Sequence, residues 1–594
     1  MIILYGIPAS IGIGIGKAYY IETKCPVVRK KTLEAEEIVA EEKRLLKALK
    51  KAETNILKQK EKFSIYGKKE LEDIYSAHSL FFSDPELKTK LLGIINAEKV
   101  NAEYAVNKVF EEQIKFQQNE RFILDLKDIK NRILSELSPE IIVKISDLPE
   151  DAIIIAKELY PSQTAELFHH KVAGIITEMG GATSHTAIIA RTLEIPAVVG
   201  LENLFSKINH GDTVIVNGSE GTVIVNPSKK VLQNYKRKRK AFVQKEKTLL
   251  KCAIEPSKTI DNKYMQISAN IELPEEIILV KKYCAEGIGL FRTEFLFHEH
   301  LKEFQKEEER QFKIYKKVLQ NISKDDSQYV IFRTFDIGGD KFFNLINYPY
   351  KESNPFLGKR AARLYLDKEG KEVFKIQLRA LLRASIYGNM RIMFPFITTI
   401  EEIREIKKIY IECVDELKRE KYPIKENIPL GIMIEIPSAA INADILAEEV
   451  DFFSIGTNDL IQYTLAVDRN NENVNYLYDP FNLAVLRLIK EVIKVAKKKG
   501  KWIGICGEMA SYPTGAIILT ALGIDELSVP PMYVPIIKEV IRNISFRNIR
   551  NIVNTHIFTS KDTKETKENI KKYILPILPK IIKEEFLSEW EKKL

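Results

Sequence analysis

A histidine stands at the expected start of a helix in the segment GGATSH (residues 180–185), which continues into the apolar run TAIIARTLE. The start of a helix offers unpaired N–H groups and the positive end of the helix dipole, so a phosphorylated His185 would have its anion stabilised there. Thr183 and Ser184 could cap the helix or donate hydrogen bonds to such an anion. A single histidine near a helix start is also a common structural feature, so this segment alone leaves both interpretations open.

Three arginines follow short apolar runs in the second half of the chain. Arg292 ends the run in GLFRTEF, Arg333 ends the run in IFRTFDIGGDK, and Arg360 follows in NPFLGKRAAR. The planar guanidinium fork matches the oxygens of carboxylates and phosphates. Each arginine alone could form a structural ion pair, but together they predict a site for a small polyanionic ligand.

Acidic and thiol side chains follow further apolar runs. Glu435 closes GIMIEIP, Asn458-Asp459 closes FFSIGTND, Arg469 follows in QYTLAVDRN, and Cys506 ends the last predicted strand, in GICGEMA. Two carboxylates near arginines suit a magnesium ion that keeps waters and bridges substrate oxygens, or they balance the arginines without a metal. The cysteine is either a buried structural thiol or a proton donor at the rim of the site.

These residues need elements that bring them together. Apolar runs alternate with amphipathic helical segments over the second half of the chain, and seven are MQISANI, GIGLFRT, YVIFRTFD, RIMFPFI, LGIMIEIP, DFFSIGTND and WIGICGE. This alternation predicts a (β/α)8 barrel, in which active sites form at the carboxyl ends of the strands. The predicted ligand-binding residues lie at that end.

The first half of the chain predicts a separate α/β domain with a helical insert. The opening YGIPASIGIGIGKAYYI reads as a strand, residues 32–138 show apolar residues at helical spacing, and GDTVIVNGSEGTVIVNP predicts a hairpin. After Pro227, a Lys-rich segment without Gly or Pro extends to about Cys252 and predicts a connecting helix.

Composition excludes several classes of protein. With 594 residues, 45% of them hydrophobic and 29% charged, the chain should fold as several globular domains. The net charge of +9 is modest for this length and does not demand a nucleic-acid partner. Five scattered cysteines form no C-x-x-C pair, which argues against disulfides and zinc. No run approaches the roughly 20 apolar residues of a membrane span, and we expect neither membrane insertion nor a secretion signal.

In these motifs the chain resembles Enzyme I of the bacterial phosphotransferase system, from GIPAS through GGATSHTAIIARTLEIPAVVG to CGEMA. The resemblance implies that His185 is phosphorylated on Nε2, that phosphoenolpyruvate is the donor and that the phosphocarrier protein HPr is the acceptor in sugar uptake. It further implies a cytoplasmic homodimer that joins through the barrel. The implied site roles are substrate binding by Arg292, Arg333, Arg360, Asn458, Asp459 and Arg469, Mg²⁺ binding by Glu435 and Asp459, and protonation of enolpyruvate by Cys506.

The implied fold class is a multidomain α/β protein, in which a swivelling phosphohistidine domain with an inserted helical subdomain precedes a (β/α)8 TIM-type barrel. The expected divisions are a phosphohistidine domain at 1–31 and 139–226, an HPr-binding helical subdomain at 32–138, a linker helix at 227–255, a phosphoenolpyruvate-binding barrel at 256–546 and a helical tail at 547–594. Ile11 departs from the family pattern, which usually has Pro there, and the tail is longer and more basic than expected. Its last part, KKYILPILPKIIKEEFLSEW, predicts an amphipathic helix that packs on the barrel or on a partner.

Three other classes of protein share some of these features. Pyruvate phosphate dikinase and phosphoenolpyruvate synthase share the histidine domain and barrel, but they need a large ATP-binding domain, for which there is no room ahead of His185. A catalytically silent scaffold should have lost His185, Glu435, Asp459 or an arginine, and all are present. A nucleic-acid-binding protein based on the basic residues 236–240 would leave the acidic pair unexplained.

Overall fold

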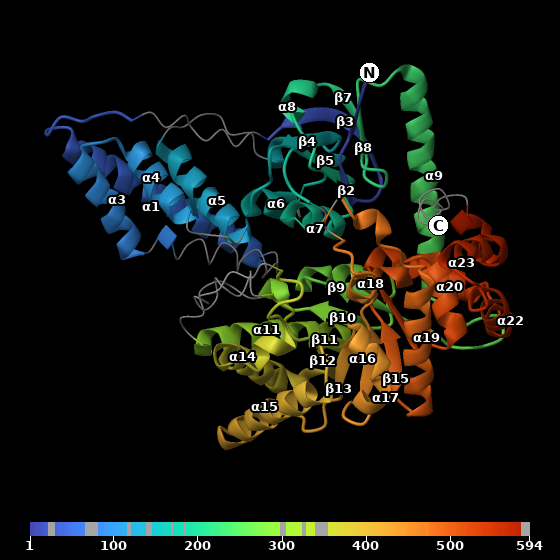
Figure 1. The fold of residues 1–594 in the computed structure, drawn as a ribbon. Coiled ribbons are helices and arrows are strands. Elements are labelled where there is room, and N and C mark those ends of the chain that lie inside the picture. Colours follow the sequence, from blue (N-terminus) through green and yellow to red (C-terminus); the bar gives the residue numbers. More distant parts are fainter. Residues whose placement is uncertain are drawn as a thin grey trace. The chain divides into compact units, whose positions relative to one another are not determined.

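The computed structural model describes residues 1–21, 30–65, 81–82, 84–115, 120–137, 145–167, 170–181, 184–296, 304–323, 328–338, 354–469, 471 and 473–583. The chain divides into two units, Met1–Gln244 and Lys245–Leu594. Figure 1 shows their elements, and each unit is described by itself below. The predicted fold class is confirmed, because an α/β unit with a helical insert precedes a closed parallel barrel.

The α/β part of the first unit is built on one eight-stranded sheet with the order β1-β8-β7-β3-β4-β5-β6-β2. The opening segment forms three strands rather than the single predicted one, and Gly12, at a φ of 118°, separates the second from the third. The predicted hairpin is present as β7 and β8. The strands are β1 (Ile2–Tyr5), β2 (Ile7–Ser10), β3 (Ile13–Tyr20), β4 (Ala152–Ala156), β5 (Gly174–Thr177), β6 (Ala197–Val199), β7 (Thr213–Asn217) and β8 (Thr222–Val225).

The helical block enters this sheet between two neighbouring strands. Strands β3 and β4 pair in parallel, with Lys17 opposite Ala152, although more than a hundred residues separate them in sequence. Parallel neighbours need a crossover connection, and the insert occupies that connection. It contains α1 (Ile38–Ile65), α3 (Pro85–Glu98), α4 (Ala102–Lys115) and α5 (Glu120–Leu137), which share a core of their own.

Three shorter helices accompany the sheet, namely α6 (Pro161–Leu167), α7 (His185–Thr192) and α8 (Leu204–Lys207). The predicted connecting helix is present as α9 (Lys229–Ala253). Its last residue is anchored in the second unit, where Lys538 Nζ donates to the carbonyl oxygen of Ala253 at 3.0 Å. Lys538 also pairs with Glu286 at 3.0 Å, so the barrel end of α9 is fixed by a buried lysine.

The second unit is a closed barrel of eight parallel strands. Seven of them contain the predicted apolar runs, and β16 was missed because it has four residues and opens with a glutamate. It closes the barrel by pairing with both β15 and β9. The strands are β9 (Gln266–Ile271), β10 (Ile288–Arg292), β11 (Val330–Arg333), β12 (Met390–Phe394), β13 (Leu430–Ile434), β14 (Phe452–Ile455), β15 (Trp502–Ile505) and β16 (Glu526–Val529).

Helices surround the barrel and bury their apolar faces against it (Figure 1). They include α10 (Ile277–Lys282), α11 (Phe304–Ile322), α13 (Ala362–Tyr365), α14 (Lys368–Ala384), α15 (Ile400–Arg419), α16 (Pro437–Ile441), α17 (Ala443–Leu446), α18 (Thr457–Leu465), α19 (Leu483–Lys498), α20 (Pro513–Leu522) and α21 (Val534–Arg542). Among the described residues, no helix has both the length and the apolar character needed to cross a membrane.

The tail packs on the barrel, which is one of the two predicted alternatives. It contains α22 (Phe546–Ile552), the π-helix η8 (Val553–Ile557), α23 (Thr563–Asn569), the π-helix η9 (Ile570–Ile574) and the 3-10 helix η10 (Leu575–Ile577). The single amphipathic helix predicted from residue 571 onward is wrong, because Pro576 and Pro579 lack the N–H groups that would continue it. Ile574 and Leu578 join the barrel's core instead, and residues 584–590 of that prediction lie outside the described part.

Candidate active site

The predicted histidine is the first residue of α7. Ser184 caps this helix, because its Oγ accepts a hydrogen bond from the backbone N–H of Ala187 at 3.3 Å. Gly180 adopts a φ of 104°, a conformation that favours glycine, and a Cβ there would approach Ser184 Oγ at 3.0 Å. The predicted helix start is therefore present, while Thr183 lies outside the described residues.

Two of the three arginines end barrel strands, as predicted. Arg292 is the last residue of β10 and Arg333 is the last residue of β11. Arg360 does not end a strand but forms an isolated bridge with Gly338, in the loop after β11. Burial would lower the pKa of Arg333, but Glu294 and Asp336 beside it raise that pKa well above its usual range. The guanidinium is therefore a fixed positive charge in a nearly dry position.

Carboxylates that the sequence interpretation did not single out hold these arginines. Glu272 contacts Arg292 Nη1 at 2.6 Å, and Glu294 contacts Arg333 Nη2 at 2.8 Å. Asp336 contacts Arg360 Nη2 at 2.7 Å and Arg333 Nη1 at 3.4 Å. A search for acidic residues within three positions of each strand-ending arginine would have found Glu294 and Asp336 in RTE and RTFD.

A carboxylate cluster in the barrel could hold a metal ion. Glu435 follows β13 directly, while Asp459 lies in the first turn of α18 rather than at a strand end. One oxygen from each of these residues and one from Asp336 lie within 4.8 Å of one another. Asp459 Oδ1 is buried without a hydrogen-bond partner, and Glu435 Oε1 accepts from the backbone N–H of Phe396 at 2.7 Å.

The electrostatics of this cluster also suit a cation. Burial raises the pKa of Glu435 to about 8, and the negative charges of Asp336 and Asp459 add to this rise. A divalent cation would offset both effects, and carboxylate oxygens are the donors that hard divalent cations prefer. The residues present therefore fit a divalent metal, and Asp336 is a neighbour that the sequence interpretation missed.

The remaining predicted residues lie beyond β14 and β15: Asn458 is in α18, Arg469 follows α18, and Cys506 comes directly after β15. Asn458 Oδ1 accepts from the backbone N–H of Glu508 at 2.9 Å, and Arg469 Nη2 lies 3.9 Å from Asp459 Oδ1. Cys506 follows β15, which is the seventh barrel strand rather than the last, and Ser454 Oγ donates to its Sγ at 3.5 Å. Burial raises the pKa of the Cys506 thiol to about 12, so this group stays protonated at neutral pH.

Several buried polar atoms in this part of the barrel have no hydrogen-bond partner. They are Arg292 Nε, Glu294 Oε2, Arg333 Nε, Thr457 Oγ1 and Asp459 Oδ1. Buried polar groups are nearly always paired in folded proteins, so a concentration of unpaired ones indicates a place that a ligand completes. The donors among them suit an anion and the acceptors suit a cation.

The structure thus brings the predicted barrel residues into one charged site. Arg333 acts electrostatically on both Glu435 and Cys506, and Arg360 is influenced by Asp459. His185 belongs to the other unit.

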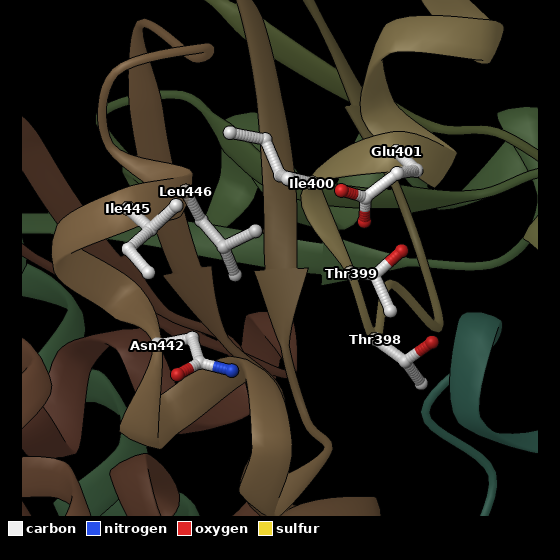
Figure 2. Close-up of a pocket in the computed structure, with 7 residues that line it drawn as sticks. All are labelled: Thr398, Thr399, Ile400, Glu401, Asn442, Ile445 and Leu446. Carbon is white, nitrogen blue, oxygen red and sulfur yellow. The ribbon is translucent and has the colours of Figure 1, made fainter.

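A pocket of about 210 Å³ in the barrel unit contains none of the predicted site residues. Figure 2 shows its side chains, which are Thr398, Thr399, Ile400, Glu401, Asn442, Ile445 and Leu446. Its volume lies below the roughly 300 Å³ at which typical small-molecule sites begin.

Family models match three successive parts of the chain. The N-terminal domain of PEP-utilising enzymes matches residues 5–121, their mobile domain matches residues 148–221, and their PEP-binding domain matches residues 246–546. The PEP-binding match alone spans about half of the chain and contains the whole barrel.

Curated relatives match nearly the whole length. A protein of Priestia megaterium named phosphoenolpyruvate-protein phosphotransferase is 43% identical over 579 residues, which is 96% of this chain and 98% of the relative. A protein of Bacillus subtilis (strain 168) with the same name is 44% identical over 536 residues, covering 88% and 91%. A solution structure of Enzyme I is 41% identical, covers 40% of this chain and 99% of its own, and has a TM-score of 0.36. The predicted resemblance is confirmed, and the chain belongs to the phosphoenolpyruvate-protein phosphotransferases, the Enzyme I family of transferases.

Proposed function

We propose that this enzyme transfers the phosphoryl group of phosphoenolpyruvate to Nε2 of His185 and then to a histidine of the phosphocarrier protein HPr, releasing pyruvate. Its relatives are named for a transfer from phosphoenolpyruvate to protein. The observation that carries the proposal is the combination, in one barrel, of arginines with unpaired donors and a buried carboxylate cluster. Phosphoenolpyruvate is a small trianion, and this combination matches its charge.

Substrate binding is assigned to the arginines and to Asn458. Arg292 and Arg333 each keep a buried Nε without a partner, so they can donate to carboxylate or phosphoryl oxygens without first breaking a hydrogen bond. Arg360 and Arg469 add positive charge, and Arg469 is about one-third exposed, which leaves it free to move onto a ligand.

The metal is proposed to be Mg²⁺, held by Glu435 and Asp459 beside Asp336. When bound, it would neutralise charge on the phosphoryl oxygens. Asp459 Oδ1 supports this assignment because it is a buried carboxylate oxygen that no hydrogen bond satisfies.

In the transfer, neutral His185 Nε2 forms a bond to phosphorus while the bond from phosphorus to the enol oxygen breaks. The arginines stabilise negative charge on the departing enolate, and Cys506 gives its proton to the methylene carbon to yield pyruvate. A thiol with a pKa of about 12 keeps its proton until the enolate forms, which suits a donor to carbon. The imidazole then passes the phosphoryl group to HPr.

The domain roles follow from this reaction. The α/β domain at 1–31 and 139–226 carries the histidine, the helical subdomain at 32–138 is assigned to HPr, and the barrel at 256–546 to phosphoenolpyruvate. The linker at 227–255 is assigned to the movement of His185 between its two partners, and the tail at 547–594 is assigned to packing on the barrel. The enzyme is proposed to act in the cytoplasm as a dimer joined through the barrel.

The test is labelling of the purified enzyme with ³²P-phosphoenolpyruvate, with Mg²⁺ or with EDTA. We expect acid-labile, alkali-stable label that requires the metal and is absent from His185→Ala. His210→Ala serves as the matched control, since His210 lies in the same unit, where it packs edge-on against Tyr19. The absence of label on folded wild type, or label that persists in His185→Ala, would contradict the proposal.

A further inference from the structure

Glu294 bridges the two arginines that end neighbouring barrel strands. It opens the 3-10 helix η3 (Glu294–Leu296), directly after β10. Its Oε1 accepts from Arg333 Nη2 at 2.8 Å, and its Oε2 lies 3.7 Å from Arg292 Nε. Among the residues that the structure describes, no other carboxylate forms ion pairs with both of these arginines.

The Arg333 side of this bridge lies in a poorly solvated position, where an ion pair fixes geometry strongly, whereas the side chain of Arg292 is 37% exposed. The side chain of Glu294 is 16% exposed and that of Arg333 is 6% exposed. Glu294 occupies one terminal nitrogen of Arg333 and leaves the Nε atoms of both arginines without hydrogen-bond partners. Arg333 is thus held at Nη2 while its Nε remains available to a ligand. Arg292 is held at Nη1 by Glu272, and its Nε faces Glu294 Oε2 at 3.7 Å without forming a hydrogen bond.

The same carboxylate also ties the loop after β10 to the loop after β11. Glu294 Oε1 accepts from the backbone N–H of Asp336 at 2.8 Å. Asp336 in turn holds Arg360 Nη2 at 2.7 Å. Glu294 therefore influences three arginines, two directly and the third through the loop that carries its partner.

The two loops do not depend on Glu294 alone for their backbone positions. Thr293 Oγ1 donates to the carbonyl oxygen of Arg333 at 2.8 Å, and Gln377 Nε2 donates to Thr293 Oγ1 at 2.9 Å. Gln377 Oε1 accepts from the backbone N–H of Phe335 at 3.1 Å. Removal of the Glu294 carboxylate should therefore free the guanidinium groups while the loops stay in place.

We propose that Glu294 is a positioning residue, which sets Arg292 and Arg333 in the orientation that receives the anionic groups of phosphoenolpyruvate. This inference rests on the proposed function. Groups held in place before the substrate arrives cost no reorganisation during the reaction, whereas arginines free to rotate lose that advantage. Glu294 acts through the two arginines and exchanges no proton with the substrate.

The experiment compares Glu294→Ala and Glu294→Gln with Glu308→Ala as a matched control. Glu308 also holds two arginines, Arg379 Nε and Arg383 Nη1, each at 2.7 Å, and its side chain is 12% exposed. These arginines belong to α14, outside the strands of the barrel. Each alanine variant thus removes a carboxylate of low exposure that pairs with two arginines, and the variants differ in whether those arginines face phosphoenolpyruvate.

The measurements are the KM for phosphoenolpyruvate and the kcat of ³²P labelling, together with the Tm. We expect Glu294→Ala to raise KM on the order of tenfold or more, with a smaller effect on kcat, because misplaced binding groups weaken substrate capture. Glu294→Gln should raise KM less, since its amide oxygen can still accept from Arg333 and Asp336. Glu308→Ala should lower the Tm about as much as Glu294→Ala while its KM equals that of wild type.

A second measurement separates positioning from general damage. Enzyme loaded at saturating phosphoenolpyruvate should pass its label to HPr at the wild-type rate in Glu294→Ala, since that step uses His185 and not the arginines. Equal KM values for Glu294→Ala, Glu308→Ala and wild type would overturn the inference. Failure of wild type itself to become labelled would instead contradict the proposed function, so the two failures are distinguishable.

Discussion

Both ends of the barrel bury charged side chains, but different groups surround the charge at each end. At the carboxyl end, Arg292, Arg333 and Asp459 keep buried atoms without hydrogen-bond partners, next to carboxylates that could hold a metal. At the amino end, Glu526 opens β16 and is fully buried among Tyr329, Trp502 and Arg391. The same eight strands thus carry, at one end, a carboxylate cluster that could hold a metal and, at the other, a carboxyl group packed among aromatic rings, where Glu526 Oε2 also lacks a hydrogen-bond partner.

At the amino end, a raised pKa of Glu526 favours its neutral form, and aromatic rings stabilise the charge of Arg391. Burial raises the pKa of Glu526 to about 7. Tyr329 Oη lies 2.9 Å from Glu526 Oε1 and 3.0 Å from Gln266 Oε1, and one hydroxyl proton cannot serve both acceptors. A protonated Glu526 supplies the second proton. The guanidinium of Arg391 stacks 3.9 Å from the Tyr329 ring and 4.6 Å from the Trp502 ring.

This difference teaches that burial alone does not mark a functional residue. Glu526 and Glu435 are both buried carboxyl groups with raised pKa values, but of the two only Glu435 belongs to a carboxylate cluster that could hold a metal and lies at the carboxyl end. In barrels of this type the carboxyl end carries function and the amino end carries stability. The following predictions test that division.

The largest effect is expected from the arginines at the two ends. Arg333→Met should slow labelling by phosphoenolpyruvate about 100-fold or more, because it removes a buried charge aimed at the substrate. Arg391→Met should leave labelling unchanged and cost about 1 kcal/mol of stability through its lost ring contacts. Initial labelling rates and Tm values test both variants. An equal loss of labelling in the two variants would contradict the assignment of function to the carboxyl end and stability to the amino end.

A smaller effect is expected from pH at the amino end. The pKa of Glu526 is about 7 in the folded protein and near 4.5 when unfolded, so the folded state binds more protons between these values and stability falls as pH rises through this window. Glu526→Gln removes that loss, which amounts to about 3 kcal/mol. As the pH rises from about 5 to about 8, the Tm of wild type should therefore fall more than the Tm of Glu526→Gln. The labelling rates of the two proteins at neutral pH should be equal. Parallel Tm profiles would show that Glu526 is not the titrating group.

The smallest effect is expected from two glycines close together on β15 and just beyond it. A Cβ on Gly507 would lie 1.7 Å from Thr457 Oγ1, whereas one on Gly504 would lie 2.7 Å from Glu526 Oε2. Gly504→Ala and Gly507→Ala should each cost about 1–3 kcal/mol of stability from overpacking. Labelling should slow only in Gly507→Ala, whose clash displaces the start of α18 with Asn458 and Asp459. Unchanged labelling in Gly507→Ala would mean that the start of α18 tolerates the shift.

Much of the candidate site was predictable because its residues follow strands that are recognisable in isolation. Arg292, Arg333, Glu435 and Cys506 each end or follow a continuous apolar run, and the carboxyl ends of parallel strands meet at one edge. Arg360 was predicted as a polyanion ligand but not in its actual position, since a loop carries it and its place depends on Asp336.

The sequence by itself determined the fold class, the helical insert, the linker helix and the residue types of the site, because periodicity and strand-end chemistry are local properties. Only the tertiary structure decided that Asp336 joins the carboxylate cluster and that Glu294 bridges two arginines, because these contacts join side chains from different loops. It also decided that ELSV is the eighth strand. Four residues that begin with a glutamate form a strand only because β15 and β9 both offer unpaired edges, and the barrel cannot close without them.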